Sequence, residues 1–368
     1  MKWQKLIRSN ILAMEAYEPV MPLANLAEQT GQPVTAFVRL NANENPYGPS
    51  PKAATAVAEA QYLHQYPDPE ARQLRRGLSM VTGVPEETLL VGAGADELID
   101  LTARAIIAPG DSIIDCPPSF GMYPATSAIN GARIINVPRD GDFSLDVTAI
   151  EAAAENSQAK LLFLCSPNNP DGSYIDDQTL RRLLRLPLLV LLDEAYVEFA
   201  IAGANGLDSR MTWTTQYENL VVLRTFSKVA GLAGLRLGYG AYPAWLAAQL
   251  WKIKQPYNIN AVAAAAGVAA LADGDWLGEK AALLVAERDR LAACLQEFDF
   301  LQPYPSQANF VLCKVIGRDA RNLRDGLAQQ GILIRYFAKP GLEQCIRISA
   351  GKPDDTDRLI EALHNVEA

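Results

Sequence analysis

The middle of the chain alternates between short apolar runs and longer amphipathic stretches. The runs read DSIIDC, RIINV, KLLFLC, LLVLLD, LVVLR and LGYGAY, at residues 111–116, 133–137, 160–165, 188–193, 220–224 and 237–242. They are apolar at nearly every position, as expected of strands that are covered by helices on both faces. Helical stretches such as 96–107 and 176–184 lie between them. The alternation predicts an α/β fold in which helices wrap a mostly parallel sheet.

The pattern changes at about residue 260. A long zone rich in alanine and leucine is followed by apolar runs that alternate with helical stretches, at 309–315, 331–337 and 344–350. This arrangement predicts a second, smaller α+β domain. Residues 1–40 fit neither pattern and predict an arm that packs on the small domain or on a partner subunit. The predicted division is therefore an arm at 1–40, a large domain at 41–258 and a small domain at 259–368.

The composition narrows the possible classes of function. Of 368 residues, 49% are hydrophobic, enough for a large core, and the length suggests two to three domain-sized units. The net charge of -9 disfavours a nucleic-acid-binding protein. The five cysteines show neither metal-ligand spacing nor the density of a secreted scaffold, and no apolar stretch is long enough to span a membrane. Because Ser9, Asn10 and Glu15 interrupt the N-terminal apolar run, it is a poor signal peptide. We expect a cytoplasmic protein that binds small molecules.

Three side chains with complementary chemistry follow the apolar runs. Asp193 ends LLVLLD, Lys228 lies in TFSKVAGLAGLR, and Arg236 comes eight residues later. Ligands of parallel sheets bind beyond the carboxyl ends of the strands. A lysine that forms an imine, an acid that keeps a ring nitrogen protonated and an arginine that holds a phosphate are what pyridoxal phosphate requires. Alone, Lys228 would read as a surface lysine and Asp193 as a helix cap; together with Arg236 they predict this cofactor.

A site for the cofactor phosphate is predicted at the segment VGAGADELID, residues 91–100. Two glycines precede the expected helix start, so the backbone N–H groups of Ala95 and Asp96 could meet the anion with help from the helix dipole. Side-chain donors would come from Thr225, Ser227 and Arg236. A dinucleotide-binding fingerprint competes with this interpretation, but Glu97 stands where that motif needs its third glycine.

Eight segments taken together resemble the fold-type I pyridoxal-phosphate aminotransferases, and within them the histidinol-phosphate aminotransferase branch. They read LNANENPYGPSP (40–51), QYPDP (65–69), VGAGADELID (91–100), CPPSFGMY (116–123), CSPNNPDG (165–172), LLDEAYVEF (191–199), TFSKVAGLAGLRLGY (225–239) and QCIRISAG (344–351). The similarity extends from about residue 17 to the C-terminus, in the order of the family. It implies a large domain with a mostly parallel seven-stranded sheet, a smaller α+β domain and a homodimer with shared active sites.

The resemblance also assigns roles around the cofactor. Lys228 would bind it and, once displaced by substrate, move a proton at the substrate Cα, which requires a lowered amine pKa. Asp193 would pair with the pyridine nitrogen. Further cofactor contacts are implied for Tyr196 and Asn169 at the ring hydroxyl, Phe120 on the ring face, and Tyr66 at the phosphate of the partner subunit's cofactor. Phe120 could also be an ordinary core residue, and Asn169 also suits the turn before Pro170.

Substrate contacts are implied for four residues. Arg347, in the apolar run CIRIS, matches the family's arginine for the substrate α-carboxylate, whose planar fork suits bidentate binding. Arg335 and Tyr17 resemble residues near the phosphate of histidinol phosphate, and Asn43 lies near the same entrance. The chain departs from the family at Asp171, where threonine is common; a turn tolerates aspartate, so the change bears on specificity more than on activity.

The predicted reaction is amino-group transfer between L-histidinol phosphate and 2-oxoglutarate by a ping-pong mechanism, a step of histidine biosynthesis. The alternatives are an aromatic amino-acid aminotransferase, a threonine-phosphate decarboxylase of the same superfamily and a cofactor-binding sensor. No basic or helix-turn-helix appendage supports the sensor. Histidine-based catalysis and a zinc site are disfavoured because His64 and His364 are the only histidines.

Overall fold

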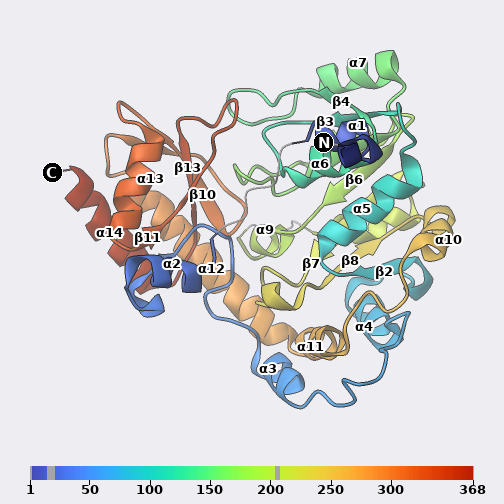
Figure 1. Ribbon diagram of the computed structural model, residues 1–368, viewed down its shortest axis with the longest axis horizontal. Helices are drawn as coiled ribbons and strands as arrows, with labels where there is room; N and C mark the ends of the chain where they lie inside the picture. Colours follow the sequence, from blue (N-terminus) through green and yellow to red (C-terminus); the bar gives the residue numbers. More distant parts are fainter. Residues whose placement is uncertain (1, 15–20, 204–207, 368) are drawn as a thin grey trace.

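The computed structural model describes residues 2–14, 21–203 and 208–367. Two domains lie side by side, and the small domain is formed mainly by the C-terminal part of the chain (Figure 1). The N-terminal segment contacts both.

Seven strands in the described part of the chain form the sheet of the large domain, in the order β2-β8-β7-β6-β5-β3-β4. Their bounds are β2 (Leu89–Gly92), β3 (Ser112–Asp115), β4 (Arg133–Asn136), β5 (Leu161–Cys165), β6 (Leu189–Asp193), β7 (Leu220–Thr225) and β8 (Gly238–Ala241). β8 runs antiparallel to β2 and β7, and the other pairs are parallel. The predicted α/β fold with a mostly parallel sheet is confirmed, and the six expected strands match β3 to β8 to within one residue at each end.

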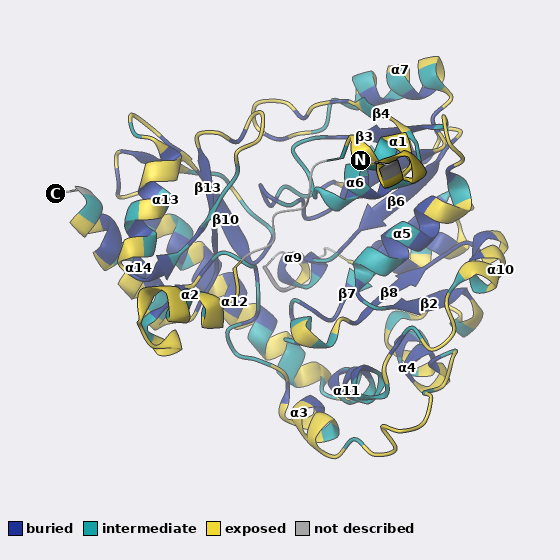
Figure 2. Ribbon diagram, viewed as in Figure 1, coloured by how far each residue is buried: buried dark blue, intermediate teal, exposed yellow. Residues whose placement is uncertain are grey.

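Helices cover both faces of this sheet, and Figure 2 shows the strands buried between them. Alternate residues of β5 enter two separate cores, Leu162 and Leu164 on one face and Leu161 and Phe163 on the other, which explains why the strand is apolar throughout. The helices are α3 (Pro51–Ala58), α4 (Arg72–Thr82), α5 (Ala95–Ile106), α6 (Met122–Ile129), α7 (Val147–Ser157), α8 (Asp177–Leu183), α9 (Val197–Gly203), α10 (Ala244–Ile253) and α11 (Ala261–Leu271). Among the described residues, no helix is both long and apolar enough to cross a membrane.

The small domain is a four-stranded antiparallel sheet, ordered β12-β13-β10-β9, with helices packed on it. Its strands are β9 (Leu301–Pro303), β10 (Phe310–Val315), β12 (Arg335–Tyr336) and β13 (Cys345–Ser349), and its helices are α12 (Gly274–Leu295), α13 (Ala320–Gln329) and α14 (Pro353–Glu367). A short parallel pair, β1 (Val38–Arg39) with β11 (Ile332–Leu333), attaches the end of the N-terminal segment to this domain.

The segments that join the domains differ from the predicted division in two respects. α1 (Ser9–Leu12) contacts the large domain, because Asn10 Nδ2 donates to the carbonyl oxygens of Ala128 and Ile129 at the end of α6, at 2.7 and 3.2 Å. α2 (Leu23–Thr30) packs on the short 3-10 helix η2 (Val34–Ala36), which precedes β1. The alanine-rich α11 packs on α3 and α4 and contributes to the core of the large domain, so that domain extends past residue 258 and the chain leaves it along α12.

Candidate functional site

A cavity of about 360 Å³ opens at the carboxyl ends of the parallel strands, and all of its lining residues lie between Ala42 and Arg236, outside the small domain. Its wall includes most of the predicted cofactor residues: Ala95, Asp96, Phe120, Asn169, Asp193, Tyr196, Thr225, Ser227, Lys228 and Arg236. Strand order explains the convergence. β5, β6 and β7 are neighbours, so the turns that follow Cys165, Asp193 and Thr225 meet at one edge of the sheet.

Lys228 reaches this cavity from the turn after β7. Desolvation lowers the pKa of its amine to about 8, and the positive charge of Arg347 acts in the same direction. Nζ lies 5.4 Å from the centroid of the Tyr196 ring. A lysine amine with a depressed pKa is partly neutral near physiological pH, so it can act as a nucleophile and as a base.

Asp193 is buried at the floor of the cavity. Its Oδ2 accepts a hydrogen bond from the Tyr123 hydroxyl at 2.8 Å, and its Oδ1 accepts one from the backbone N–H of Ala195 at 3.0 Å. Burial raises the pKa of the carboxyl to about 6. Two bonds leave acceptor capacity for a cationic ring N–H, which would stabilise the charged carboxylate. Tyr123 was not assigned a role from the sequence, although it belongs to the motif CPPSFGMY.

Cationic and N–H groups gather at the end of the cavity beside α5. Arg236 Nη2 lies 2.9 Å from Asp96 Oδ2, and the guanidinium packs against the turn that precedes the helix. Gly94 makes this approach possible, because a Cβ at that position would lie 2.6 Å from Nη2. Gly94 also supplies no side-chain cap, so the first N–H groups of α5, at Ala95 and Asp96, keep donor capacity. A phosphate fits such a cradle.

Asn169 and Arg347 join the two domains at the side of the cavity. Arg347 Nη1 donates to Asn169 Oδ1 at 2.5 Å, and Nη2 donates to the carbonyl of Asn41 at 3.1 Å. The bond to Oδ1 orients the amide, so that its NH₂ group can donate to a ring oxygen. Arg347 is buried, with its guanidinium carbon 5.1 Å from the Phe310 ring centroid and 5.4 Å from that of Phe337.

Arg335 stands directly opposite Arg347 in the antiparallel pair of β12 and β13. Directly opposed residues of such a pair point to the same face, where two like charges destabilise each other. Among the described residues, no ion pair links Arg335 to a carboxylate. Two arginines in this arrangement favour an anionic ligand with oxygens for both.

Three other predicted residues lie in different surroundings. Asn43 is buried and donates through Nδ2 to the Tyr196 hydroxyl at 3.1 Å, so it orients Tyr196 and does not line the substrate entrance. Tyr66 is 82% exposed and lies outside the cavity, with its ring stacked on Tyr257 at 4.6 Å between centroids. Tyr17 lies outside the described residues.

Asp171 supports the cavity wall from behind. The carboxylate is buried; it accepts hydrogen bonds from Asn168 Nδ2 and, at 2.8 Å, from the backbone N–H of Ser173. Asn168 in turn accepts a bond from Ser119 Oγ at 2.8 Å, next to Phe120. The aspartate therefore braces the turns that carry Asn169 and Phe120 and is not among the residues that line the cavity.

The donor set as a whole fits the cofactor that the sequence predicts. The cavity offers a nucleophilic amine, a buried acid for a ring nitrogen, an amide and a phenol for a ring oxygen, and a phosphate cradle at a helix start. Burial raises the pKa of the Tyr196 hydroxyl, which therefore stays protonated and able to donate. These are the kinds of group that pyridoxal phosphate requires around its ring.

Comparison with known proteins gives consistent results. The sequence model of the family described as aminotransferase class I and II matches residues 35–363. A histidinol-phosphate aminotransferase of Roseiflexus castenholzii is 50% identical, with 98% of each chain covered, and a chloroplastic one of Arabidopsis thaliana is 48% identical over 97% of this chain and 85% of its own length. The crystal structure of histidinol-phosphate aminotransferase from Sinorhizobium meliloti, in complex with pyridoxal-5'-phosphate, is similar with a TM-score of 0.88 and 30% identity, covering 98% of this chain and 97% of that one.

Proposed function

The chain belongs to the class I and II aminotransferases, and from this membership we propose that it transfers an amino group between L-histidinol phosphate and 2-oxoglutarate. Its cofactor is pyridoxal phosphate. When bound, this cofactor supplies an electron-accepting ring and carries the amino group between the two half-reactions of a ping-pong cycle. The reaction is a step of histidine biosynthesis.

The opposed pair of Arg335 and Arg347 carries this assignment of substrate. L-Histidinol phosphate has no carboxylate, and its only anionic group is a phosphate with several oxygens. A phosphate can accept bonds from both guanidinium groups and relieve their mutual repulsion. 2-Oxoglutarate has carboxylates, so in the second half-reaction it would make the carboxylate contact that the resemblance implies for Arg347. One pair of side chains can therefore serve both substrates.

The remaining side chains act on the proton and on the cofactor ring. The neutral amine of Lys228 would remove a proton from the substrate Cα and return one in the reverse direction. Asp193 would hold a proton at the ring nitrogen, while Tyr123 and Ala195 fix the carboxylate. Tyr196 and the Asn169 amide would donate to the ring oxygen, and Asn43 and Arg347 orient these two donors.

Substitution of Arg335 tests the substrate. Changing Arg335→Gln is expected to lower kcat/KM for L-histidinol phosphate by about 100-fold, the size of a lost charged hydrogen bond to phosphate, and to leave L-phenylalanine turnover within about threefold. Arg321→Gln is the matched control. Arg321 is exposed, and its guanidinium lies over the ring of Tyr336, the neighbour of Arg335 in β12. An equal loss with both substrates would contradict the role of Arg335 and favour the aromatic amino-acid aminotransferase.

The pKa of Lys228 predicts how cofactor uptake depends on pH. Below about pH 8 the amine is protonated and cannot attack a carbonyl, so uptake of pyridoxal phosphate by the cofactor-free protein should accelerate between roughly pH 6.5 and 9. Stopped-flow absorbance measures this rate. Pyridoxamine phosphate, which has no carbonyl, is the control and should bind without this midpoint. A midpoint near the ordinary value of 10.5 would show that the pocket does not depress the pKa of the amine.

We further propose that the enzyme is a cytoplasmic homodimer. The exposed Tyr66 and its partner Tyr257 support the homodimer, since a tyrosine pair with one ring 82% exposed is typical of a surface that another subunit covers. The same assembly would bring Tyr66 to the cofactor phosphate of the partner. The five free cysteines support a reducing compartment.

A further inference from the structure

The phosphate-binding turn and the segment that carries Tyr66 are joined by a chain of hydrogen bonds behind the cavity. The chain runs through Glu97, Asn258 and Lys254. Neither Asn258 nor Lys254 lines the cavity, and the reaction described above uses neither of them. The connection therefore calls for a role of its own.

Glu97 begins the chain on the side of the cofactor. Its Oε2 accepts a hydrogen bond from the backbone N–H of Ala93, in the turn between β2 and α5. This bond closes the turn onto the first turn of the helix. Because Ala93 donates to Glu97, and Gly94 donates to Gly92 at 2.7 Å, the next N–H groups, those of Ala95 and Asp96, are left to meet the phosphate.

Asn258 holds that turn from the loop between α10 and α11. Nδ2 donates to Glu97 Oε2 at 2.8 Å and to the carbonyl of Val91 at 3.2 Å, so one amide contacts both ends of the turn. Oδ1 accepts a bond from Lys254 Nζ at 2.7 Å. Since a lysine ammonium can only donate and a carboxylate can only accept, the two partners fix the orientation of the amide.

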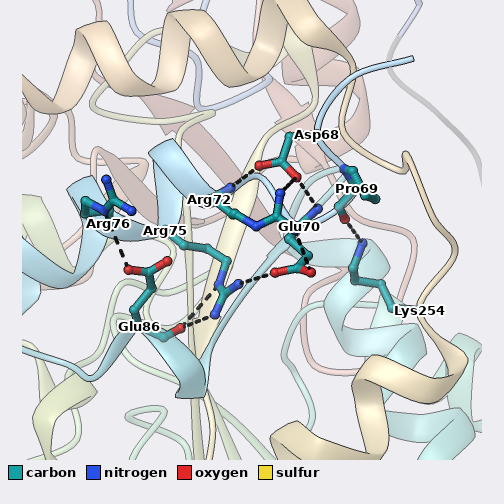
Figure 3. Close-up of polar contacts among 8 residues, drawn as sticks. All are labelled: Asp68, Pro69, Glu70, Arg72, Arg75, Arg76, Glu86 and Lys254. Atoms are coloured by element: carbon teal, nitrogen blue, oxygen red, sulfur yellow. Dashed lines mark hydrogen bonds and ion pairs between the residues drawn. The ribbon is translucent and has the colours of Figure 1, made fainter.

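Lys254 carries the connection to the segment of Tyr66. Its ammonium also donates to the carbonyl oxygen of Pro69 at 3.1 Å (Figure 3). A further bond goes to the carbonyl oxygen of Gln255 at 3.1 Å, so the three donors have three acceptors. Pro69 lies three residues after Tyr66. Asp68 further fixes this segment, because its carboxylate accepts backbone N–H bonds from Glu70 and Arg72 at the start of α4.

A second contact joins the same two segments. The Tyr66 ring stacks on Tyr257, the residue before Asn258, with an interplanar angle of 26°. Tyr257 has a φ of +60°, an unusual value for a tyrosine, and the bonds of Asn258 and Lys254 on either side hold the backbone there. Tyr66 is therefore positioned both through its ring and through its backbone by the loop that holds the phosphate turn.

We propose that Asn258 is a positioning residue that couples the phosphate-binding turn of its own subunit to the Tyr66 that its subunit donates to the partner's site. This inference rests on the proposed cofactor and homodimer. Each phosphate in the dimer would contact one turn and one Tyr66, and the two chains of hydrogen bonds would link the two sites. Loss of the Asn258 amide would then weaken the contacts to the cofactor phosphate. The contacts to the cofactor ring would stay unchanged.

Equilibrium binding to the cofactor-free protein separates these two effects. Asn258→Ala is expected to weaken binding of pyridoxal phosphate at least tenfold and binding of pyridoxal, which lacks the phosphate, less than threefold. Asn260→Ala is the matched control: Asn260 lies in the same loop and caps α11 by accepting from Ala263 N, and it has no bond to the phosphate turn. Equal weakening of both ligands, or of neither, would overturn the proposal.

A double-mutant cycle tests the coupling to Tyr66. Asn258→Ala combined with Tyr66→Phe should weaken pyridoxal phosphate binding clearly less than the product of the two single effects. Independent effects would overturn the coupling. Lys254→Met provides a second variant in case Asn258→Ala does not fold, as judged by urea unfolding. It should also weaken binding of pyridoxal phosphate more than binding of pyridoxal, by a smaller factor than Asn258→Ala.

Two measurements on the wild type test the premises separately. Sedimentation tests the dimer, because a monomer would overturn the link between the two sites. Turnover of L-histidinol phosphate tests the reaction itself.

Discussion

Replacing Lys228 with arginine is expected to reduce transamination of L-histidinol phosphate by at least about four orders of magnitude. Arginine keeps the positive charge and the approximate size, but it cannot lose a proton at any usable pH. It therefore removes both the nucleophile and the base, and base catalysis alone contributes up to about 10⁴-fold. The lowered pKa of Lys228, about 8, is the physical property that arginine cannot reproduce.

Single-turnover absorbance measurements on the purified variant would show this effect without interference from product release. Lys280→Arg is the matched control, since Lys280 lies on α12, pairs with Glu279 and does not line the cavity. Its activity should stay within about twofold of the wild type. More than about one per cent of wild-type activity in Lys228→Arg would contradict the role given to this amine.

Replacing Asp193 with asparagine is the second large effect that we expect. The amide keeps the size of the side chain but cannot bear the negative charge that holds a proton at the ring nitrogen. Removal of one preorganised electrostatic partner from a buried site typically costs about 10²–10³-fold in kcat. The loss should therefore appear in kcat, while KM for L-histidinol phosphate changes by less than about threefold, because Asp193 would contact the cofactor and not the substrate.

Steady-state kinetics with saturating cofactor measures both quantities for Asp193→Asn. Asp111→Asn is a suitable control, because Asp111 also lies beside a strand of the large sheet and pairs with Lys160 far from the cavity. A kcat within tenfold of the wild type, or a loss carried by KM, would argue against the pairing of Asp193 with the ring.

Most strands of the large domain could be predicted from the sequence because they are buried on both faces; the edge strand β4 is the partly exposed exception. A run such as KLLFLC sends alternate side chains into two cores, so every position must be apolar, and the run ends where the cavity begins. β2, which reads LLVG, was missed because its last two residues belong to the glycine-containing segment VGAGADELID, which was assigned to phosphate binding. Position along the chain relative to these runs was also enough to predict that Asn169, Asp193 and Lys228 converge.

Contacts between distant side chains could not be predicted in the same way. Tyr123 lies on α6 in an amphipathic pattern, and only the packing of that helix on the sheet brings its hydroxyl to Asp193. Asn258 reads as a polar loop residue, and the sequence carries no signal that its amide meets Glu97 across 161 positions. The boundary at residue 258 was set by a change in composition, whereas the small side chains of α11 pack it onto the large domain.

The measurement that tests the central claim most directly is a comparison of amino donors on the purified holoenzyme. Kinetics with L-histidinol phosphate and with L-phenylalanine, each with 2-oxoglutarate as acceptor, gives kcat/KM for the two donors. The opposed pair of Arg335 and Arg347 predicts a preference for L-histidinol phosphate of about 100-fold or more, the value of a charged contact to the phosphate. Equal use of the two donors, or a preference for L-phenylalanine, would contradict it.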